Sequence, residues 1–323
     1  MKLAVVIPCF KVREQILGVI ETIGPEAAAI YVVDDCCPAG SGRLVGQACP
    51  DPRVKVLFNE QNQGVGGAVM RGYQAAVADG MEVVVKLDGD GQMPAELIPL
   101  LVAPIGRGEA DYVKGNRFFT VESVKEMPLL RLLGNAALSF ATKLSTGYWS
   151  LFDPTNGFTA IHVSVLAQLP MDKIARRYFF ETDMLFRLNV ARAVVAEMPM
   201  TARYRDEKSN LRISRILLPF ALGHLRNFTK RIFYNYFLRG FQLASVELVI
   251  GLACILFGVS FGVWIWSRNE GLGVNTPPGP VMLAALPIMT GVQLLLAFLN
   301  FDVKAEPSVP LHPRLPKRAG KPR

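Results

Sequence analysis

EVVVKLDGDGQ, residues 82–92, joins a run of apolar, β-branched residues to a turn that carries two acids. A run without regular polar alternation predicts a strand that is buried on both faces, as in a parallel sheet. Four other segments have the same character, and helical patterns lie between them. The strands are expected at residues 3–8, 29–35, 54–58 and 111–115, and the helices at 12–23, at 66–78 and after Pro94. This alternation predicts an α/β fold, with a mostly parallel sheet and helices on both faces.

Polar residues follow the predicted strands at the points where those strands end. The carboxyl ends of parallel strands share one edge of a sheet, and ligands of such sheets bind at that edge. The sequence therefore predicts a binding site there. The residues at these positions are Pro8, Asp34, Asp35, Asn59, Asp88 and Asp90.

The turn KLDGDGQ is the sharpest candidate for a metal site. Asp88 and Asp90 are two residues apart, and the neighbouring glycines let the backbone bring them close to Gln92. Carboxylate and amide oxygens with room for water suit Mg²⁺ or Mn²⁺ bound together with a substrate diphosphate. The alternative is a turn whose acids cap the next helix. Asp34 and Asp35 argue against it, because two acid pairs at one sheet edge repel unless a cation or a donor-rich ligand lies between them.

The composition is too apolar for a wholly soluble protein. Of the 323 residues, 51% are hydrophobic and only 19% are charged. At about 150 residues per domain, the length allows about two domains. Five cysteines and no export leader before the first strand predict reduced thiols in the cytosol rather than a secreted, disulfide-bonded protein. The same composition excludes a disordered chain, collagen and a coiled coil.

Two apolar runs, residues 246–266 and 281–301, account for this composition. At about 1.5 Å per helical residue, each is long enough to cross a hydrocarbon layer of about 30 Å. The link at 267–280 is rich in glycine and proline, which predicts a hairpin with both chain ends on one side of a membrane. The alternative is a buried hairpin in a soluble core.

The net charge of +8 comes from two basic segments beside these runs, residues 201–245 and 301–323. Positive segments outside the hairpin place the N-terminal region in the cytoplasm, by the positive-inside rule. Their position also favours anionic or phosphorylated lipid as a partner over nucleic acid. Residues 128–147 and 213–243 combine apolar and basic side chains in a pattern typical of interfacial helices, with core packing as the alternative. The chain from Pro307 onward is predicted to be disordered.

Taken in order, VVIPCF, VVDDCCP, NQGVGGAV and KLDGDGQ resemble the nucleotide-sugar glycosyltransferases of family 2, which have the Rossmann-like GT-A fold. Further motifs are DPTNGF, FFETDM and RYRDEKSNL, which precede the two apolar runs. With them the chain is similar to the branch of dolichol-phosphate mannose synthases and bacterial polyprenyl-phosphate glycosyltransferases. The resemblance covers residues 2–215 in motifs and the remainder in layout.

The resemblance implies roles for particular positions. Pro8, Asp35 and Asp88 would line the nucleoside pocket, Asp90 and Gln92 would bind the metal with Asp88 nearby, and Arg117 would bind the donor nucleotide near its phosphates. The sequence departs from the family after the first strand, where FKVR stands in place of Tyr-Asn-Glu-Glu. Glu14, at the position of a later common acid, is then the donor-site candidate of that segment.

An acceptor that is a phosphate monoester needs positioning more than deprotonation, because its second pKa is about 6. Arg203, Arg205 and Lys208 stand between the predicted sheet domain and the first apolar run, and they are the candidates for holding it. Charges that merely meet anionic lipid are the alternative. Asp153 would be the catalytic base if the acceptor were a hydroxyl, and otherwise it would cap the turn of DPTNG.

These observations predict a transferase that moves one sugar from a UDP- or GDP-sugar to a polyprenyl phosphate at the cytoplasmic face of the cell membrane. Metal dependence rests on Mg²⁺ or Mn²⁺ at Asp90, and inversion is implied by the family alone. The expected division is a catalytic domain at 1–212, interfacial helices at 213–245, a hairpin at 246–301 and a basic tail at 302–323. Transfer to a hydroxyl, a catalytically silent membrane scaffold and assembly as a homo-oligomer stay open.

Overall fold

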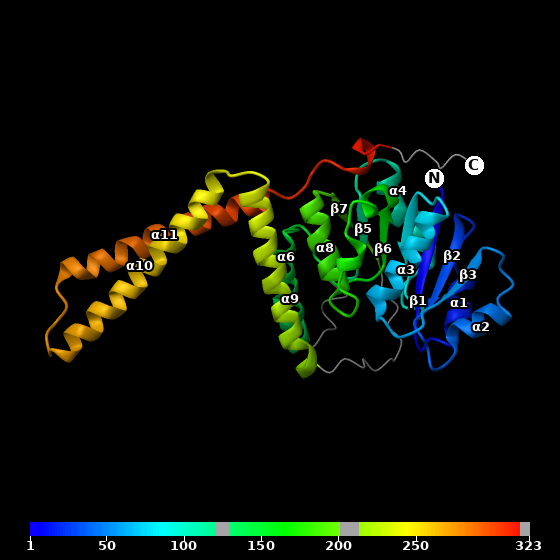
Figure 1. The fold of residues 1–323 in the computed structure, drawn as a ribbon, viewed down its shortest axis with the longest axis horizontal. Helices are drawn as coiled ribbons and strands as arrows, with labels where there is room; N and C mark the ends of the chain where they lie inside the picture. Colours follow the sequence, from blue (N-terminus) through cyan, green and yellow to red (C-terminus); the bar gives the residue numbers. More distant parts are fainter. Residues whose placement is uncertain (120–128, 201–212, 317–323) are drawn as a thin grey trace. The chain divides into compact units, whose positions relative to one another are not determined.

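The structure, a computed structural model, describes residues 1–119, 129–200 and 213–316. They form two compact units, whose ribbons are shown in Figure 1. The first unit contains residues 1–229 and the chain from Pro307 onward, and the second contains residues 230–306.

The first unit is built on a seven-stranded sheet with the order β3-β2-β1-β4-β6-β5-β7. Only β6 runs antiparallel to its neighbours among these strands. The amino-terminal end of β6 therefore lies at the edge where the other strands have their carboxyl ends. The strands are β1 (Leu3–Cys9), β2 (Ala27–Asp34), β3 (Val54–Phe58), β4 (Val83–Lys86), β5 (Tyr112–Asn116), β6 (Thr159–His162) and β7 (Val195–Pro199).

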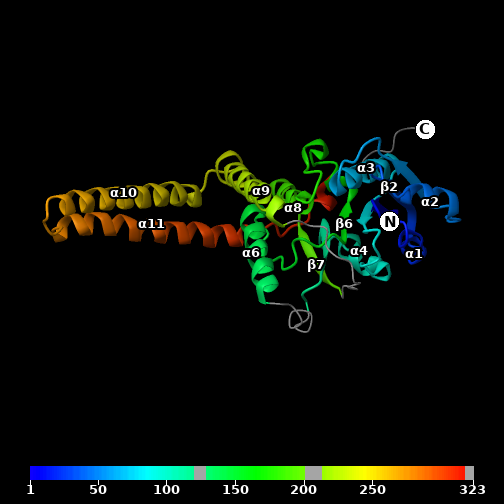
Figure 2. The same ribbon diagram turned by 90° about the horizontal axis from the view of Figure 1, so that it is seen from below.

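Helices cover both faces of this sheet, as Figure 2 shows. The side chains of β1 alternate between two apolar layers. Leu3, Val5 and Ile7 pack with α1, α2 and α4, whereas Ala4 and Val6 pack with α3 and α8. The predicted α/β fold is confirmed. The helices are α1 (Ile16–Glu21), α2 (Ser41–Ala48), α3 (Val65–Ala78), α4 (Ile98–Gly106) after the 3₁₀ turn Ala95–Leu97, α7 (Val163–Leu166) and α8 (Phe180–Ala191), with a second 3₁₀ turn at Met171–Lys173.

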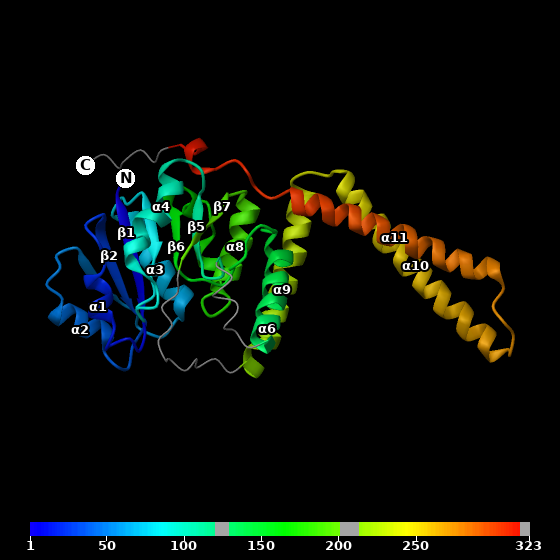
Figure 3. The same cartoon turned by 180° about the vertical axis from the view of Figure 1, so that it is seen from behind.

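Two longer helices, α6 (Leu129–Thr146) and α9 (Ile213–Phe233), lie beyond the end of the sheet (Figure 3). Ser145 Oγ of α6 is 2.8 Å from His224 Nδ1 of α9. Asn227 is buried on one face of α9 and donates to Asp183 Oδ1 of α8 at 3.1 Å. Another face of α9 is apolar and exposed. It carries four well-exposed leucines, which are Leu217, Leu218, Leu222 and Leu225. The helix is therefore amphipathic, as the sequence predicts.

The second unit consists of the last turn of α9, a π-helical turn at Tyr234–Leu238 and the two helices α10 (Leu243–Gly271) and α11 (Pro278–Lys304). Both helices are long and apolar enough to cross a membrane, and they contain the two predicted runs. The two helices approach each other closely at Gly251 and Gly291. A side chain would not fit there, because a Cβ on Gly291 would lie 2.7 Å from the carbonyl oxygen of Gly251. Most of their apolar side chains remain exposed, which is the character of a membrane hairpin.

A buried ion pair closes the base of this hairpin. Arg231 Nη1 lies 2.5 Å from Asp302 Oδ1, and the Tyr236 hydroxyl donates to the same oxygen at 2.6 Å. Arg231 and Asp302 are each 2% exposed. One of the basic residues expected to face lipid headgroups is thus neutralised inside the protein.

The expectation of disorder from Pro307 onward is wrong for residues 307–316. The backbone N–H groups of Leu311 and His312 both donate to the Asp111 carboxylate. Leu311 N lies 2.7 Å from Oδ2, and His312 N lies 2.7 Å from Oδ1. The His312 ring stacks on His162 with 4.4 Å between centroids, and a 3₁₀ turn forms at His312–Arg314. The proline and charge content that suggested disorder is outweighed by one buried acid that binds two backbone donors. Residues 317–323 lie outside the described part of the chain.

Candidate active site

The strand order brings the sequence motifs to one edge of the sheet. Pro8 at the end of β1 pairs with Val33 of β2, and Val6 pairs with Lys86 at the end of β4. The loop before β6 reaches the same edge because β6 runs the other way. The turn after β4, the residues after β5 and the DPTNGF loop are therefore neighbours.

Asp35 holds the glycine-rich turn that precedes α3. Its Oδ1 accepts from Asn59 Nδ2 at 2.7 Å and from Gln63 N at 2.8 Å, and its Oδ2 accepts from Gly64 N at 2.8 Å. Gly64 has φ +81°, and a Cβ there would lie 2.6 Å from the Arg176 carbonyl oxygen, so the turn requires glycine.

Asp34 is satisfied in a similar way. Its two carboxylate oxygens accept from the backbone N–H groups of Cys37 and Gly42, both at 2.7 Å. The charge repulsion between acid pairs, for which the sequence predicts a cation or ligand, is thus relieved at this pair by N–H groups of the protein. The argument for a metal then depends on the second acid pair alone.

The second acid pair occupies an open turn after β4. Gly91 has φ +76°, and Gln92 N donates to Asp90 Oδ1 at 3.0 Å, so the turn folds back on Asp90. Asp88, Asp90 and Gln92 are each partly exposed. The described residues contain no group of three His, Cys, Asp or Glu side chains placed to enclose an ion. The donor set fits a divalent ion that takes one or two carboxylates and completes its shell with water and phosphate oxygens.

Arg117 and Asp153 form a bidentate ion pair at this edge. Arg117 Nε lies 2.7 Å from Asp153 Oδ2, Arg117 Nη2 lies 2.9 Å from Oδ1, and the Arg117 backbone N–H also donates to Oδ2 at 3.1 Å. The Asp153 side chain is fully buried, whereas that of Arg117 is 29% exposed. Asp153 thus fixes the guanidinium in one orientation and leaves part of it accessible.

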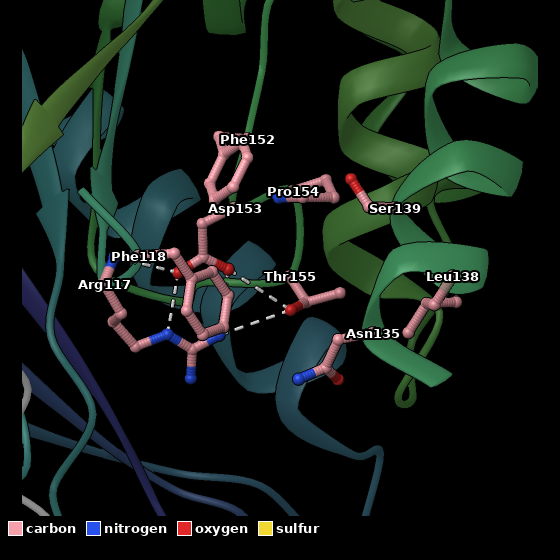
Figure 4. A pocket seen from close by; sticks show the side chains of 9 residues that line it. All are labelled: Arg117, Phe118, Asn135, Leu138, Ser139, Phe152, Asp153, Pro154 and Thr155. Atoms are coloured by element: carbon pink, nitrogen blue, oxygen red, sulfur yellow. Dashed lines mark hydrogen bonds and ion pairs between the residues drawn. The ribbon is translucent and has the colours of Figure 1, made fainter. Parts of the chain in front are cut away.

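A cavity of about 210 Å³ opens beside this ion pair (Figure 4). Arg117, Asp153 and Thr155 lie on one side of it, and α6 contributes Asn135 and Ser139 on the other. Its remaining wall is apolar. The full lining is Arg117, Phe118, Asn135, Leu138, Ser139, Phe152, Asp153, Pro154 and Thr155. A cation and several hydrogen-bonding groups within apolar walls suit an amphiphilic ligand with an anionic head.

The sequence comparison agrees with this arrangement, since the profile described as glycosyl transferase family 2 matches residues 4–169. This chain belongs to that family. It is 32% identical over 170 residues to the UDP-N-acetylglucosamine–dolichyl-phosphate N-acetylglucosaminyltransferase of Methanococcus voltae, which is 53% of this chain and 67% of that protein. It is 30% identical over 211 residues to the undecaprenyl-phosphate mannosyltransferase of Micrococcus luteus, which is 64% of this chain and 85% of that protein.

Among solved structures, this glycosyltransferase is similar to glucosyl-3-phosphoglycerate synthase from Mycobacterium tuberculosis, solved with Mn²⁺, UDP-glucose and phosphoglyceric acid. The TM-score is 0.52 at 19% sequence identity, and the match covers 71% of this chain and 79% of that one. The fold is therefore GT-A. The names of the two sequence relatives agree with the polyprenyl-phosphate branch that the motifs predict.

Two buried lysines at this edge, Lys86 and Lys114, are not among the predicted site residues. Lys86 is buried, with its Nζ 2.8 Å from Asp88 Oδ1 and 3.5 Å from Glu181 Oε1. Burial alone would lower the pKa of Lys86, but the carboxylates of Asp88 and Glu181 raise it above its usual value. Lys114 is fully buried, and burial lowers its pKa to about 8. The signal was a lysine in each of two otherwise apolar strands, VVVK and YVKGN.

Other predicted site residues of this glycosyltransferase are placed less closely. Pro8 is partly exposed at the end of β1, and Glu14 is exposed in the turn before α1. Neither is drawn into the polar network around Asp88. The three predicted acceptor residues, Arg203, Arg205 and Lys208, lie outside the described residues.

Proposed function

We propose that this glycosyltransferase moves a single sugar from a nucleotide-diphosphate sugar to a polyprenyl phosphate at a membrane surface. The observation that carries the proposal is the cavity beside Arg117, where an oriented guanidinium lies among both hydrogen-bonding and apolar side chains. The named relatives act on dolichyl or undecaprenyl phosphate, and the second unit supplies two helices able to span a membrane.

The acceptor phosphate would contact Arg117, a residue that the family resemblance instead implies at the donor phosphates, with Asn135, Ser139 and Thr155 as further donors around the cavity. A phosphate monoester is largely ionised at neutral pH, so it attacks without a base. Asp153 is engaged by Arg117 through both carboxylate oxygens, which favours a holding role over proton abstraction. The basic residues Arg203, Arg205 and Lys208 would add to the positive field around the acceptor.

The donor would bind at the ends of β1, β2 and β4. Asp35 and Asp88 would line the nucleoside pocket, with Pro8 and Glu14 on the neighbouring segment. Asp90 and Gln92, with Asp88 nearby, are the residues that would hold Mg²⁺ or Mn²⁺. Such an ion would neutralise charge on the departing nucleoside diphosphate. The M. tuberculosis synthase of the same fold was solved with Mn²⁺ and UDP-glucose, which supports this choice.

The proposal includes inversion at the transferred sugar and a catalytic domain in the cytoplasm. Inversion follows from direct attack by the acceptor phosphate on the face opposite the diphosphate. The proposed division of the chain remains a catalytic domain at 1–212, interfacial helices at 213–245, a spanning hairpin at 246–301 and a tail at 302–323. The exposed leucines of α9 suit the interfacial position.

The deciding experiment compares a polyprenyl phosphate with the corresponding polyprenol, using purified protein in detergent and a panel of UDP- and GDP-sugars. Donor-dependent release of UDP or GDP should require the phosphate. Equal turnover with polyprenol would replace the proposal with transfer to a hydroxyl.

Variants test the contact with the acceptor. Arg117→Gln should raise the acceptor KM about ten- to a hundredfold, because one charge-assisted contact contributes about 1.5–3 kcal/mol. Arg203→Ala and Lys208→Ala should act in the same direction. The matched control is Arg107→Gln, which removes an exposed arginine paired with Glu109 and should leave both substrates unaffected.

A further inference from the structure

Two buried lysines flank the same residue of β6. Lys86 of β4 and Lys114 of β5 are both in register with Thr159, the first residue of the strand between them. Lys86 is 1% exposed and Lys114 is 0% exposed. Burial of a lysine costs free energy unless its ammonium group is paired or hydrogen-bonded. The contacts of each lysine therefore indicate its role.

Both ammonium groups hold the backbone of the DPTNGF loop. Lys86 Nζ donates to the carbonyl oxygen of Gly157 at 3.1 Å, and Lys114 Nζ donates to that of Asn156 at 2.6 Å. Two consecutive carbonyls are therefore fixed from two different strands. The loop that carries Asp153 is pinned immediately before it enters β6.

Lys86 also connects this loop with the acid turn. Its Nζ lies 2.8 Å from Asp88 Oδ1 and 3.5 Å from Glu181 Oε1. Space for this arrangement exists because residue 157 is glycine. A Cβ there would collide with Lys86 Nζ and would lie 2.8 Å from Asp88 Oδ2.

We propose that Lys86 and Lys114 are positioning residues that fix the distance between the two halves of the site. Lys86 orients Asp88 on the donor side, and Lys114 fixes the loop that carries Asp153, which in turn orients Arg117 at the acceptor cavity. The assignment of the two sides rests on the proposed function. Loss of Lys86 should then act chiefly on the donor, and loss of Lys114 chiefly on the acceptor.

Lys86→Met and Lys114→Met keep the length of the side chain and remove its charge. Lys86→Met should weaken binding of UDP or GDP, measured by calorimetry without acceptor, at least tenfold. Lys114→Met should leave that binding within about twofold and raise the acceptor KM at least tenfold. The matched control is Lys55→Met, which removes a half-exposed lysine of β3 that pairs with Asp79 and should change neither quantity.

Hydrogen exchange gives a readout that needs no substrate. In Lys114→Met the peptide covering residues 150–158 should lose protection while the peptides of β1 and β4 keep theirs. If a methionine variant fails to fold, Gly157→Ala serves instead, because it displaces the loop while both lysines remain. At an unchanged melting temperature it should weaken nucleotide binding and raise the acceptor KM together, and unchanged values of both would overturn the proposal.

Equal loss of donor and acceptor binding in both lysine variants, in step with a lowered melting temperature, would show a general structural role and overturn the proposal. Unchanged exchange of residues 150–158 in Lys114→Met would also overturn it. Failure of wild-type protein to use polyprenyl phosphate would instead count against the proposed function. Nucleotide binding and hydrogen exchange would still test the lysines.

Discussion

The carboxylates of Asp90 and Asp153 lie in opposite surroundings. Asp153 is fully buried, and both its oxygens accept from Arg117. Asp90 stands in a partly exposed turn, where Gln92 N donates to one of its oxygens. Removing one partner of a buried ion pair leaves an uncompensated charge, whereas an exposed carboxylate can change partners with water or a cation. The surroundings of Asp153 suit a fixed structural contact, whereas those of Asp90 suit a divalent cation that binds together with a diphosphate.

Asp153→Asn should therefore loosen Arg117 without abolishing chemistry. We expect the acceptor KM to rise about tenfold or more, since a charge-assisted contact contributes about 1.5–3 kcal/mol. The kcat at saturating acceptor should stay within an order of magnitude. The measurement is an acceptor titration at saturating donor from pH 6 to pH 9. Loss of turnover at every pH with an unchanged acceptor KM would instead identify Asp153 as the base.

Asp90→Asn should keep the fold and lose divalent-dependent turnover by orders of magnitude. The substitution removes one charge from a partly exposed turn and hardly changes the volume, so unfolding should be unaffected. Turnover is measured with Mg²⁺, with Mn²⁺ and with EDTA, and Glu109→Gln at an exposed surface pair is the control. Wild-type activity that persists in EDTA would refute the metal requirement.

The titration of Lys114 makes the free energy of unfolding vary with pH in the alkaline range. Burial lowers its pKa from 10.5 to about 8, although the carboxylates of Glu181, Asp153 and Glu197 oppose this shift and Lys86 adds to it. Between about pH 8 and pH 10 the unfolded chain still binds the proton that the folded protein has released. The free energy of unfolding contributed by this group therefore rises with pH in that window.

Wild-type protein should gain stability relative to Lys114→Met as the pH rises from about 8 to about 10. The gain is at most about 1.4 kcal/mol per pH unit. Denaturant unfolding in detergent at several pH values checks it, and the difference between the two proteins cancels groups common to both. Parallel curves would show that Lys114 does not titrate in this range.

At the scale of elements, the strands and the apolar helices could be predicted because their signals are local. The run VVVK ends where β4 ends, and both predicted spans lie inside α10 and α11. The helix expected at residues 12–23 forms only at Ile16–Glu21, because residues 13–15 make a turn instead. Local periodicity thus identifies an element better than its limits.

The antiparallel direction of β6 was beyond the reach of the sequence. Its pairing with both β4 and β5 joins residues far apart in the chain, and no local pattern encodes such an order. Yet this one reversal carries the DPTNGF loop to the edge that holds Asp88. The motifs identified Asp88, Asp90, Arg117 and Asp153 individually, but the ion pair and the two lysine contacts depend on tertiary packing.

At the scale of the whole chain, the segment after α11 belongs to the same compact unit as residues 1–229. Asp111 accepts from the N–H groups of Leu311 and His312, and Leu311 and Leu315 pack against the apolar layer that contains Tyr112. The chain thus leaves the first unit before α10 and returns to it after α11. A pair of spanning helices satisfies this connectivity, whereas a single span would put parts of one folded unit on opposite sides of the membrane.

The connectivity makes topology the sharpest test at this scale. If residues 246–301 form a spanning hairpin, the link between α10 and α11 is the only described part of the chain that reaches the far side. A cysteine at Asn275, in a variant without the five native cysteines, should react with a membrane-impermeant maleimide in intact cells. A cysteine at Glu109, which is well exposed in the first unit, should react only after permeabilisation. Reporters at the N-terminus and after Asp302 should both read cytoplasmic. If the hairpin spans, the two positions must lie on opposite sides of the membrane. Labelling of both cysteines only after permeabilisation would therefore show that the apolar helices do not cross. Labelling of Glu109→Cys alone in intact cells would show the opposite orientation.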